Sequence, residues 1–590
     1  MFKVKNFSQQ QSSHKNSNKN HAINCWNSSS VSLVILSSIW GTQPLNAQEV
    51  NLVAIKDGET KTTRLEHSQV DLLIVSTPAT ESAQQPEVSA KITDETPEKI
   101  VVKNFNVVGS SVFSQEELIN AIKSYQNRPL TLPELFQARS AITKLYTDKG
   151  YVNSGAYIPP QELNNGTIKI AVLEGQLEGI NVTGTKHLNP SYIEKRIKSA
   201  AGVPVNVDSL LEALQLLRLD PLIANVSAEL SAGVRPGTSL LDIEVEEADV
   251  FNLTASYNNG RSPSVGTIQR SISLNYGNLL GFGDKFNFNY TNSKGSNSFD
   301  FAYGFPVNAK NGTIRMAVGT NSNEVVEEPF TPLDIESESH YYELNFRQPI
   351  ILKPEQEFAL GLSFSRQASD TFLYGDIPFY LSRGADNNGE TRISAFRFYQ
   401  EYVNRDESKV FALRSQFSVG VDLFNATIND DAPDSTFFAW RGQSQWVRRL
   451  GEDFLFLVRG DVQLAGSSLV PLEQFRVGGV DSARGYRQDL SLGDSGVFTS
   501  AELRVPIFRI SKIDGLVQIA PFVDVGTLWN NDDVEIENST LPSVGLGLNF
   551  SAGESFNARL DWGIPLTDVK NQSGSLQEDG VYFSLNYNFF

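Results

Sequence analysis

The sequence contains almost no cysteine and little histidine. Its 590 residues include one cysteine, Cys25, which lies in a segment that we expect to be removed from the mature protein. A mature chain without cysteine can form neither a disulfide framework nor a cysteine metal site. The five histidines lack the spacing of metal ligands (His14, His21, His67, His187 and His340). We therefore expect no metal and no other cofactor.

The chain also lacks an excess of positive charge. Its formal net charge is −19 at pH 7. Binding to nucleic acid requires a basic surface, because the phosphates must be neutralised. Nucleic acid is therefore not an expected partner, and the acidic surface by itself indicates no more than solubility.

Long apolar runs are absent as well. Apart from residues 31–40, no stretch approaches the ~20 apolar residues that a membrane-spanning helix needs. If the mature protein spans a membrane, it must do so as a closed β-barrel, in which every backbone polar group is paired. Residues 31–40 follow a lysine-containing segment and precede small and polar residues that end at Ala47. This order predicts a secretory signal peptide over 1–47, with a disordered tail as the alternative.

Residues 48–99 have the composition of a linker. They contain few aromatic residues, many Thr, Ser, Glu and Gln, and three prolines (Pro78, Pro86 and Pro97). This composition is typical of a flexible linker. The periodicity around residues 70–75 does not distinguish a short helix from a short strand.

Residues 100–248 contain an internal repeat of about 75 residues. The segment FNVVG at 105–109 is echoed by INVTG at 180–184. In the first unit a strand over 100–107 leads into Gly109, and two helices and two strands follow. The second unit repeats this β-α-α-β-β order. We predict two small α+β domains at 100–175 and 176–248, and chance similarity is the alternative.

Capping signals mark where the helices of both units begin. Two of them are capping boxes, in which a Ser or Thr is followed three residues later by Glu. The second unit has a Pro at a first helical position and an Asp before the next helix. The predicted starts are Ser114 with Glu117, Thr131 with Glu134, Asn189 with Pro190, and Asp208.

From about residue 249 to the end, helical periodicity disappears. Short segments alternate apolar and polar residues and are separated by Gly, Asn, Asp and Pro. In the last segment the apolar members are Val581, Phe583, Leu585, Tyr587 and Phe589. Such alternation places one face of a strand in lipid and the other in a polar lumen.

The predicted fold class is an all-β transmembrane barrel over residues 249–590, preceded by the two α+β domains. We count about sixteen antiparallel segments, an even number that places both ends of the barrel on the periplasmic side. A soluble β-sandwich also alternates. We favour the barrel because aromatic residues lie on the apolar face of many strands and a predicted signal peptide precedes them.

No arrangement of catalytic residues can be identified. Gly-Phe-Gly-Asp at 281–284 predicts a turn rather than a phosphate-binding loop, because no helix follows it. Neither a Ser-His-Asp nor a Cys-His set can be defended. We therefore expect a protein that is not an enzyme.

One long segment lies between the eleventh and twelfth predicted strands. Residues 466–495 are rich in Gly and Asp, and long loops in compact barrels are usually functional or disordered. Two segments later, the alternation directs Asp524 into the lumen. An inward carboxylate at mid-strand needs a cationic partner, and a bidentate arginine suits it best. We predict that Arg484 folds into the lumen and pairs with Asp524, with two separately solvated charges as the alternative.

The motifs around these two residues resemble those of a known family. Arg-Gly-Tyr at 484–486 and Phe-Val-Asp-Val-Gly at 522–526 match motifs of the two-partner secretion transporters (the ShlB/FhaC/HecB group) of the Omp85 superfamily. Residues 278–284 resemble the turn after that family's second strand. The resemblance implies two polypeptide-transport-associated (POTRA) domains and an extracellular loop that folds into the barrel. It also implies a lock between loop and wall, formed by Arg484, Gly485, Tyr486, Phe522, Asp524 and Gly526.

Three features depart from the usual family pattern. Ala483 stands where the family usually has Val or Ile. The expected mature N-terminus has no clear amphipathic helix of the kind that plugs the barrel. The alternation of the last strand ends on Phe589, which leaves Phe590 out of register with the usual terminal aromatic signal.

The resemblance implies export of one dedicated exoprotein, of the haemolysin or adhesin type, through the outer membrane of a Gram-negative-type bacterium. The arm would capture the unfolded partner in the periplasm at a free strand edge of each unit. The barrel would form the conduit within outer-membrane lipid. Periplasmic chaperones and the barrel-assembly machinery are further expected partners during biogenesis.

Two other functions fit parts of the sequence. A barrel-assembly factor of the same superfamily would also carry arm repeats, but general bacterial assembly proteins usually carry more than two. A passive pore would need neither paired arm domains nor an Arg-Gly-Tyr loop.

Overall fold

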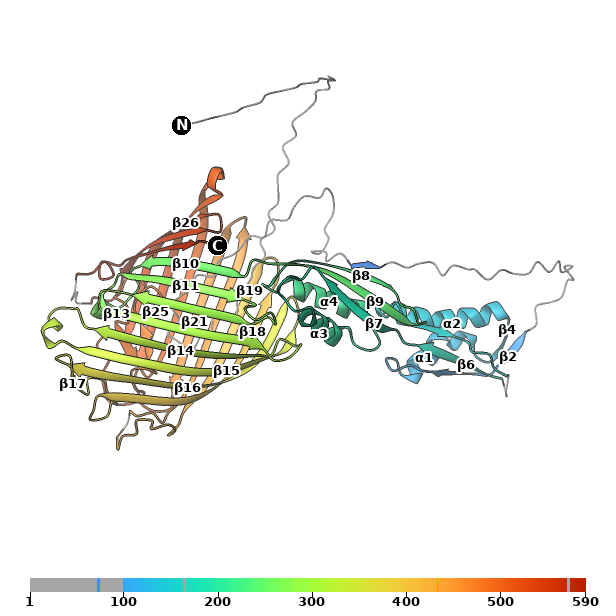
Figure 1. Cartoon of the computed structure of the whole chain (residues 1–590), viewed down its shortest axis with the longest axis horizontal. Coiled ribbons are helices and arrows are strands. Elements are labelled where there is room, and N and C mark those ends of the chain that lie inside the picture. The colour runs from blue at the N-terminus through green and yellow to red at the C-terminus, as the bar shows by residue number, and fades with distance from the viewer. Residues whose placement is uncertain (1–71, 75–98, 163–165, 432, 570–573) are drawn as a thin grey trace, which may run out of the picture.

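The computed structural model describes residues 72–74, 99–162, 166–431, 433–569 and 574–590. The predicted signal peptide at 1–47 lies outside the described residues, as do most of the predicted linker at 48–99 and the place where a plug helix would be sought. A barrel forms one end of the molecule and an elongated arm of two α+β units forms the other (Figure 1). Among the described residues, no helix is long and apolar enough to cross a membrane.

The first arm unit packs two helices against a three-stranded sheet. Both helices begin at the predicted capping boxes. The sheet order is β3-β6-β5, and β2 pairs separately with β4. The elements are β2 (Ile100–Val102), β3 (Asn104–Val108), α1 (Gln115–Ala121), the 3-10 turn η2 (Lys123–Tyr125), β4 (Arg128–Leu130), α2 (Leu132–Thr147), β5 (Gly155–Tyr157) and β6 (Thr167–Leu173).

The strand predicted over 100–107 is two strands in the structure. The backbone N–H groups of Lys103 and Asn104 both donate to the carbonyl of Gly166. This contact redirects the chain from its pairing with β4 to its pairing with β6. The β2–β4 pair is therefore an addition to the predicted β-α-α-β-β order.

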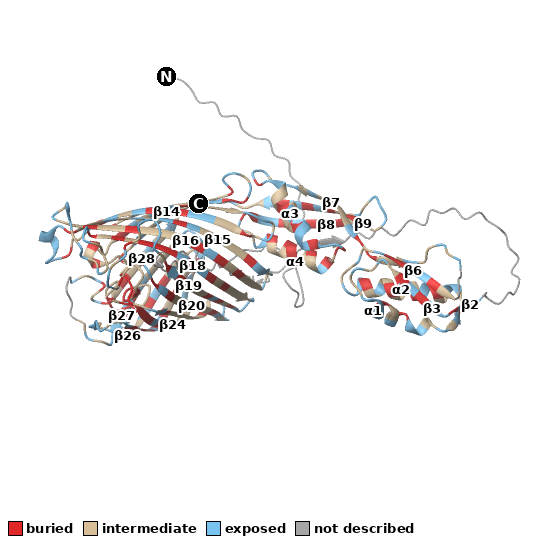
Figure 2. Cartoon of the chain, turned by 90° about the horizontal axis from the view of Figure 1, so that it is seen from below, coloured by how far each residue is buried: buried red, intermediate tan, exposed pale blue. Residues whose placement is uncertain are grey.

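The second unit repeats the arrangement with longer strands. Its sheet order is β8-β9-β7, with β7 (Gln176–Thr183), β8 (Ile223–Ala232) and β9 (Thr238–Glu247). The strand β1 (Leu72–Ile74) pairs in parallel with β8. The helices α3 (Pro190–Ala201) and α4 (Val207–Arg218) pack on one face, and in each unit the buried residues line the contact between helices and sheet (Figure 2).

The predicted cap of α4 was wrong by two residues. The side chain of Asn206, not Asp208, accepts the backbone N–H groups of Asp208 and Ser209. Asp208 lies in the first turn, where its negative charge faces the positive end of the helix dipole.

A glycine and a glutamate hold the equivalent turn in both units. Gly109 and Gly184 have φ values of +89° and +86°, and a Cβ atom on either would press into a carbonyl oxygen of the last strand of its unit. Glu174 accepts the backbone N–H groups of Ser111 and Val112, and Glu247 accepts those of residues 186–188. Burial raises the pKa of both carboxyls, but these hydrogen bonds outweigh it and hold each pKa below its usual value.

The barrel closes with sixteen long strands in the described part of the chain, as predicted, and β10 pairs with β28. The short β17 (Ile377–Pro378) extends one extracellular hairpin. The strands are β10 (Phe251–Asn258), β11 (Gln269–Gly277), β12 (Lys285–Asn292), β13 (Ser296–Pro306), β14 (Thr313–Glu324), β15 (Glu336–Leu352), β16 (Gln356–Leu373), β18 (Glu390–Arg405), β19 (Lys409–Gly420), β20 (Phe438–Gly451), β21 (Phe454–Ala465), β24 (Ser495–Ile510), β25 (Gly515–Trp529), β26 (Thr540–Ala552), β27 (Phe556–Pro565) and β28 (Val581–Asn588). The 3-10 turns are η3 (Pro263–Val265), η4 (Thr331–Leu333) and η5 (Ser511–Ile513).

The alternation of side chains along the strands follows the predicted faces. On β25, Val523 is 51% exposed on the outer face, whereas its neighbour Asp524 is 0% exposed inside. On β28, Tyr582 is buried in the interior while Leu585 and Tyr587 are exposed. This period of two is what a lipid-facing surface and a polar interior require.

The C-terminus ends just beyond β28. The N–H of Phe589 donates to the carbonyl of Leu253 on β10 (2.9 Å). The ring of Phe590 lies 5.6 Å from that of Phe251. Both terminal aromatic side chains are exposed on the outside of the barrel.

The second arm unit rests on the periplasmic turns of the barrel. The N–H of Asn189 donates to the carbonyl of Gly281 (2.7 Å), in the turn between β11 and β12. In the turn between β13 and β14, the side chain of Asn311 accepts Nε of Arg196 (2.8 Å). The turn at 278–284 that the sequence analysis identified is therefore one of the supports of the arm.

We expect the Gly184→Ala variant to destabilise the second arm unit. The added Cβ would lie 2.1 Å from the carbonyl oxygen of Val245, at a positive φ that alanine disfavours. Such strain costs about 2 kcal/mol, which corresponds to a fall in melting temperature of roughly 5 °C or more. The described α-helices all lie in the arm, so the helical circular-dichroism signal of the detergent-solubilised protein reports it.

The matched control is Gly155→Ala, in the first arm unit. Its Cβ would meet nothing closer than Thr143 at 3.7 Å. Equal melting temperatures for the two variants would contradict the role given to Gly184.

Candidate functional site

The loop between β21 and β24 folds back into the barrel. Its first part packs Leu469 and Val470 against residues of β18 and β20. It then forms a small hairpin of β22 (Phe475–Val477) and β23 (Ser491–Gly493). The tip and hairpin share a buried apolar cluster with the wall, formed by Phe475, Val477, Ala483, Tyr486, Phe498, Leu528 and Leu541. We call residues 466–494 the lid loop.

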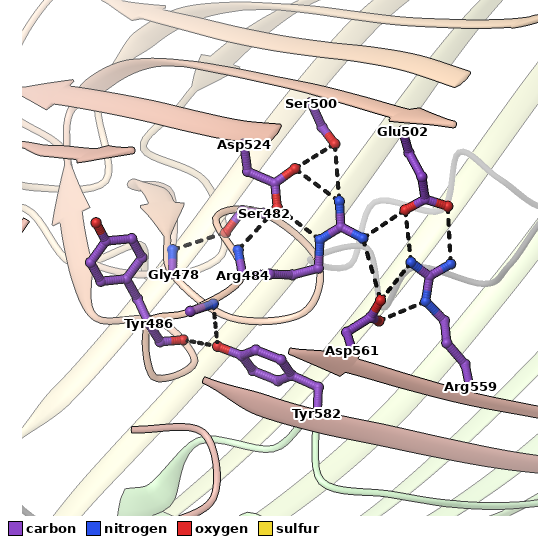
Figure 3. A network of polar contacts seen from close by, with 11 residues as sticks. Gly478, Ser482, Arg484, Tyr486, Ser500, Glu502, Asp524, Arg559, Asp561 and Tyr582 are labelled. Atoms are coloured by element: carbon purple, nitrogen blue, oxygen red, sulfur yellow. Dashed lines mark hydrogen bonds and ion pairs between the residues drawn. The ribbon is translucent and has the colours of Figure 1, made fainter. Parts of the chain in front are cut away.

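At the tip of the lid loop, Arg484 forms a bidentate pair with Asp524 of β25 (Figure 3). Nε donates to Oδ2 at 2.7 Å and Nη2 donates to Oδ1 at 2.9 Å. The backbone N–H of Arg484 also donates to Oδ2 (3.2 Å). The arginine is 2% exposed and the aspartate 0%, so the contact that the sequence analysis expected is a desolvated one.

Two further carboxylates surround the same guanidinium group. Nη1 of Arg484 donates to Oε2 of Glu502 on β24 (2.7 Å) and lies 3.7 Å from Oδ1 of Asp561 on β27. Arg559 of β27 bridges Glu502 and Asp561 from the other side, at 2.6 to 3.2 Å. Arg504 donates to Glu502 as well (2.8 Å). Three arginines are thus paired with three carboxylates, and a buried charge needs such partners.

Aromatic and hydroxyl side chains of the wall also contact Arg484 and its partner Asp524. Its guanidinium carbon lies 3.4 Å from the centre of the Phe522 ring, in a cation–π contact. Ser500 of β24 donates to Oδ1 of Asp524 (2.6 Å) and fixes that carboxylate from behind. Phe522 and Asp524 both point inward because they are two residues apart on β25.

Glycines let the tip of the lid loop approach the wall closely. Gly485 has a φ of +103°, and its N–H donates to the hydroxyl of Tyr582 on β28 (3.0 Å). A Cβ on Gly563 of β27 would lie 2.5 Å from the backbone nitrogen of Gly485. A Cβ on Gly526 would lie 2.3 Å from the Val477 side chain of the lid loop. The backbones of wall and loop can therefore touch only where side chains are missing.

Tyr486 ties the tip to the extracellular end of the wall. Its hydroxyl donates to the carbonyl of Pro542 on β26 (2.5 Å) and accepts the N–H groups of Leu566 and Thr567 (3.1 and 3.0 Å). Its own carbonyl accepts the hydroxyl of Tyr582. The tip thus contacts a continuous series of strands from β24 to β28.

The six residues named from the sequence lie together in this contact. Sequence reasoning missed a second set in the same network, namely Ser500, Glu502, Arg559, Asp561, Gly563 and Tyr582. The signal for part of this set is present in the sequence, because the alternation of apolar and polar residues along β27 and β28 puts Arg559, Asp561 and Tyr582 on the inner face. Sequence gave no means of ranking them among the other inward polar residues.

The arrangement is suited to holding a loop. Its carboxylates are occupied by guanidinium groups, and no group of three or more His, Cys, Asp or Glu among the described residues could hold a metal ion. What the site can do is fix the tip of the lid loop against the wall, or release it.

We expect the isosteric Asp524→Asn variant to loosen the lid loop. The substitution removes one of the carboxylates that neutralise the buried guanidinium group of Arg484, and this makes the seated position of the lid loop less favourable. We expect the population of the released loop to rise about tenfold to a hundredfold. The measurement is the labelling rate of Ala483→Cys by a maleimide added from outside, in a Cys25→Ser background. Ala483 is buried when the lid loop is seated.

The matched control for this experiment is Glu357→Gln. Glu357 pairs with Arg347 (2.6 Å) on the barrel wall, and that cluster contains no lid-loop residue. The control should label at the unmodified rate. Equal rates for Asp524→Asn and Glu357→Gln would contradict the role of Asp524 in seating the lid loop.

Comparison with known proteins identifies the family. Residues 237–550, more than half of the chain, match the family described as "Haemolysin secretion/activation protein ShlB/FhaC/HecB". Residues 100–175 match the POTRA domain of ShlB type. The outer membrane transporter CdiB of Escherichia coli is 24% identical, over 79% of this chain and 80% of its own length. The heme/hemopexin transporter protein HuxB of Haemophilus influenzae (strain 86-028NP) is 22% identical, over 76% and 80%.

Solved structures show the same fold. CdiB from Escherichia coli matches with a TM-score of 0.65 and 20% identity, covering 86% of this chain and 93% of its own. BamA from Haemophilus ducreyi, lacking POTRA domains 1–3, matches with a TM-score of 0.51 and 12% identity, covering 83% and 100%. From the family match, the fold and the POTRA match together, the chain belongs to the ShlB/FhaC/HecB family of haemolysin secretion/activation proteins, the outer-membrane transporters of two-partner secretion.

Proposed function

We propose that this transporter exports one dedicated exoprotein of the haemolysin or adhesin type, and that the lid loop controls the passage. The observation that carries the proposal is the seated lid loop, whose tip is fixed by Arg484 inside the barrel of a secretion-family protein. The exported chain enters from the periplasm, where the arm lies, and leaves at the extracellular mouth.

The arm supplies edges at which an unfolded chain can be added as a further strand. In the first unit, the described strands β3 and β5 each pair on one side only, with β6. In the second unit β7 is the open edge, because β8 is covered over Ala228–Leu230 by β1. In the second unit, the free edge that we expect to bind the exoprotein is therefore β7, because part of β8 is already paired with β1. Backbone pairing makes little demand on sequence, which suits a substrate recognised while unfolded.

The interior of the barrel supports its use as a conduit. Many of its charged side chains are paired along the wall, as in Arg347 with Glu401 (2.7 Å) and Arg441 with Asp461 (2.6 Å). A wall of paired, polar groups offers little apolar surface to retain an unfolded polypeptide. We infer that the lumen guides the exoprotein without binding it tightly.

We further propose that the protein is a translocator without enzymatic activity. The polar cluster around Arg484 is a set of filled ion pairs, and folding of the exoprotein outside the cell supplies the direction of transport. During its own biogenesis the chain depends on periplasmic chaperones and on the barrel-assembly machinery, which fits the exposed aromatic residues at the end of β28.

The alternative of a barrel-assembly factor receives less support. The likeness to BamA extends to the fold alone, at 12% identity. The described arm has two repeated units. A passive pore is also less well supported, since the lid loop, bound to five neighbouring strands, occupies part of the interior that a pore needs open.

The experiment is comparative proteomics of the culture medium and the outer membrane after deletion of the gene. We expect one or a few large secreted proteins to disappear from the medium while other outer-membrane barrels stay at their normal level. A general fall in outer-membrane barrels would instead establish an assembly role and overturn the export proposal.

A further inference from the structure

A second ion-pair cluster lies at the extracellular mouth, three residues beyond Arg484 in the lid loop. Arg487 donates from Nη1 to Oε1 of Glu327 (2.8 Å) and from Nη2 to Oε2 (2.7 Å). Its Nη1 also lies 3.5 Å from Oε1 of Glu578. The side chains of Arg487, Glu327 and Glu578 are 13%, 7% and 4% exposed, so this is a shielded cluster rather than a surface salt bridge.

The partners of Arg487 belong to two extracellular loops. Glu327 lies between β14 and β15, and Glu578 lies between β27 and β28. In the order of strands around the barrel, β14 is eight strands from β25, which carries Asp524, in either direction. Glu327 therefore comes from a loop that begins far from Asp524 in the order of strands, and it meets Arg487 beside Glu578 of the β27–β28 loop. Arg487 thus joins the lid loop to two extracellular loops that start at well-separated strands.

The neighbouring residue links the lid loop to a third extracellular loop. The N–H of Gln488 donates to Oε1 of Gln577 (2.9 Å), and Nε2 of Gln577 donates to the carbonyl of Arg261, between β10 and β11 (2.8 Å). The N–H of Val326 donates to the carbonyl of Ser264 in that same loop (2.8 Å). The loops on this side thus form a hydrogen-bonded collar, and Arg487 and Gln488 are the points where the lid loop joins it.

We propose that Arg487 is a positioning residue that keeps the extracellular mouth closed at rest, by clasping the lid loop to Glu327 and Glu578. The inference rests on the proposed export function, since a closed mouth matters only if the barrel is a conduit. The clasp is separate from the Arg484 site, because the two arginines share none of the carboxylates named above. Breaking it opens the mouth while the tip of the lid loop stays on the wall.

The test is the conductance of the purified, full-length protein in planar bilayers, where no exoprotein is needed. We expect Arg487→Ala to raise the fraction of time in open states about tenfold, because a charge-assisted bond biases a two-state equilibrium by about that factor. Glu327→Gln should raise the fraction of time in open states in the same way. This second variant tests the proposal if Arg487→Ala fails to fold.

A charge exchange separates a clasp from a merely structural contact. In Arg487→Glu with Glu327→Arg, the three positions keep the same total charge, and we expect the conductance to return to that of the unmodified protein. The single Arg487→Glu variant gathers three carboxylates and should be the most open. The matched control is Arg509→Ala, which removes an arginine that pairs with Asp453 on the periplasmic rim and should leave the conductance unchanged.

Unmodified conductance in both Arg487→Ala and Glu327→Gln would overturn the proposal, as would an exchange variant no better than Arg487→Glu. An equal rise in Arg509→Ala would also overturn it, since the effect would then not belong to the mouth. Failure of the export function is seen separately, as a culture medium that gene deletion leaves unchanged.

Discussion

The guanidinium group of Arg484 is held inside the barrel wall, and the arrangement of the interior follows from its charge. A cation taken out of water needs close anionic partners, or its burial costs several kcal/mol. Here the partners come from three strands, Glu502 on β24, Asp524 on β25 and Asp561 on β27. Because the three carboxylates would repel one another, Arg559 is needed to balance them. The pair is thus part of a network whose members have to be in place together.

This network determines where the lid loop lies more than how stable the barrel is. Buried ion pairs contribute little net stability compared with apolar packing, but they define one geometry sharply. Glycines at 485, 526 and 563 allow the loop to reach that geometry, since side chains there would separate loop and wall. At its other end the loop packs on β18 and β20 through Leu469 and Val470. A polypeptide leaving through the barrel therefore meets a loop with a defined resting position, which transport has to displace.

Much of this organisation could be predicted from the sequence, for physical reasons that particular residues show. The capping boxes at Ser114 and Thr131 are local signals, and both helices begin there. The period of two on β25 and β28 placed Asp524 and Tyr582 inside. The cap at Asp208 was misplaced because Asn206, two residues earlier, also has a capping side chain, and the N–H groups of Asp208 and Ser209 are bound to Asn206. The β2–β4 pair and the Glu502–Arg559–Asp561 cluster could not be predicted, since both depend on contacts between distant segments that the sequence does not order.

The central claim is that the seating of the lid loop by Arg484 serves export rather than assembly of the barrel. The most direct measurement is the amount of exoprotein in the medium for Arg484→Ala, compared with the amount of folded, heat-modifiable barrel in the outer membrane. The account predicts a normal amount of folded barrel and a strong loss of secreted exoprotein. Secretion at the unmodified level by a correctly inserted Arg484→Ala barrel would contradict it.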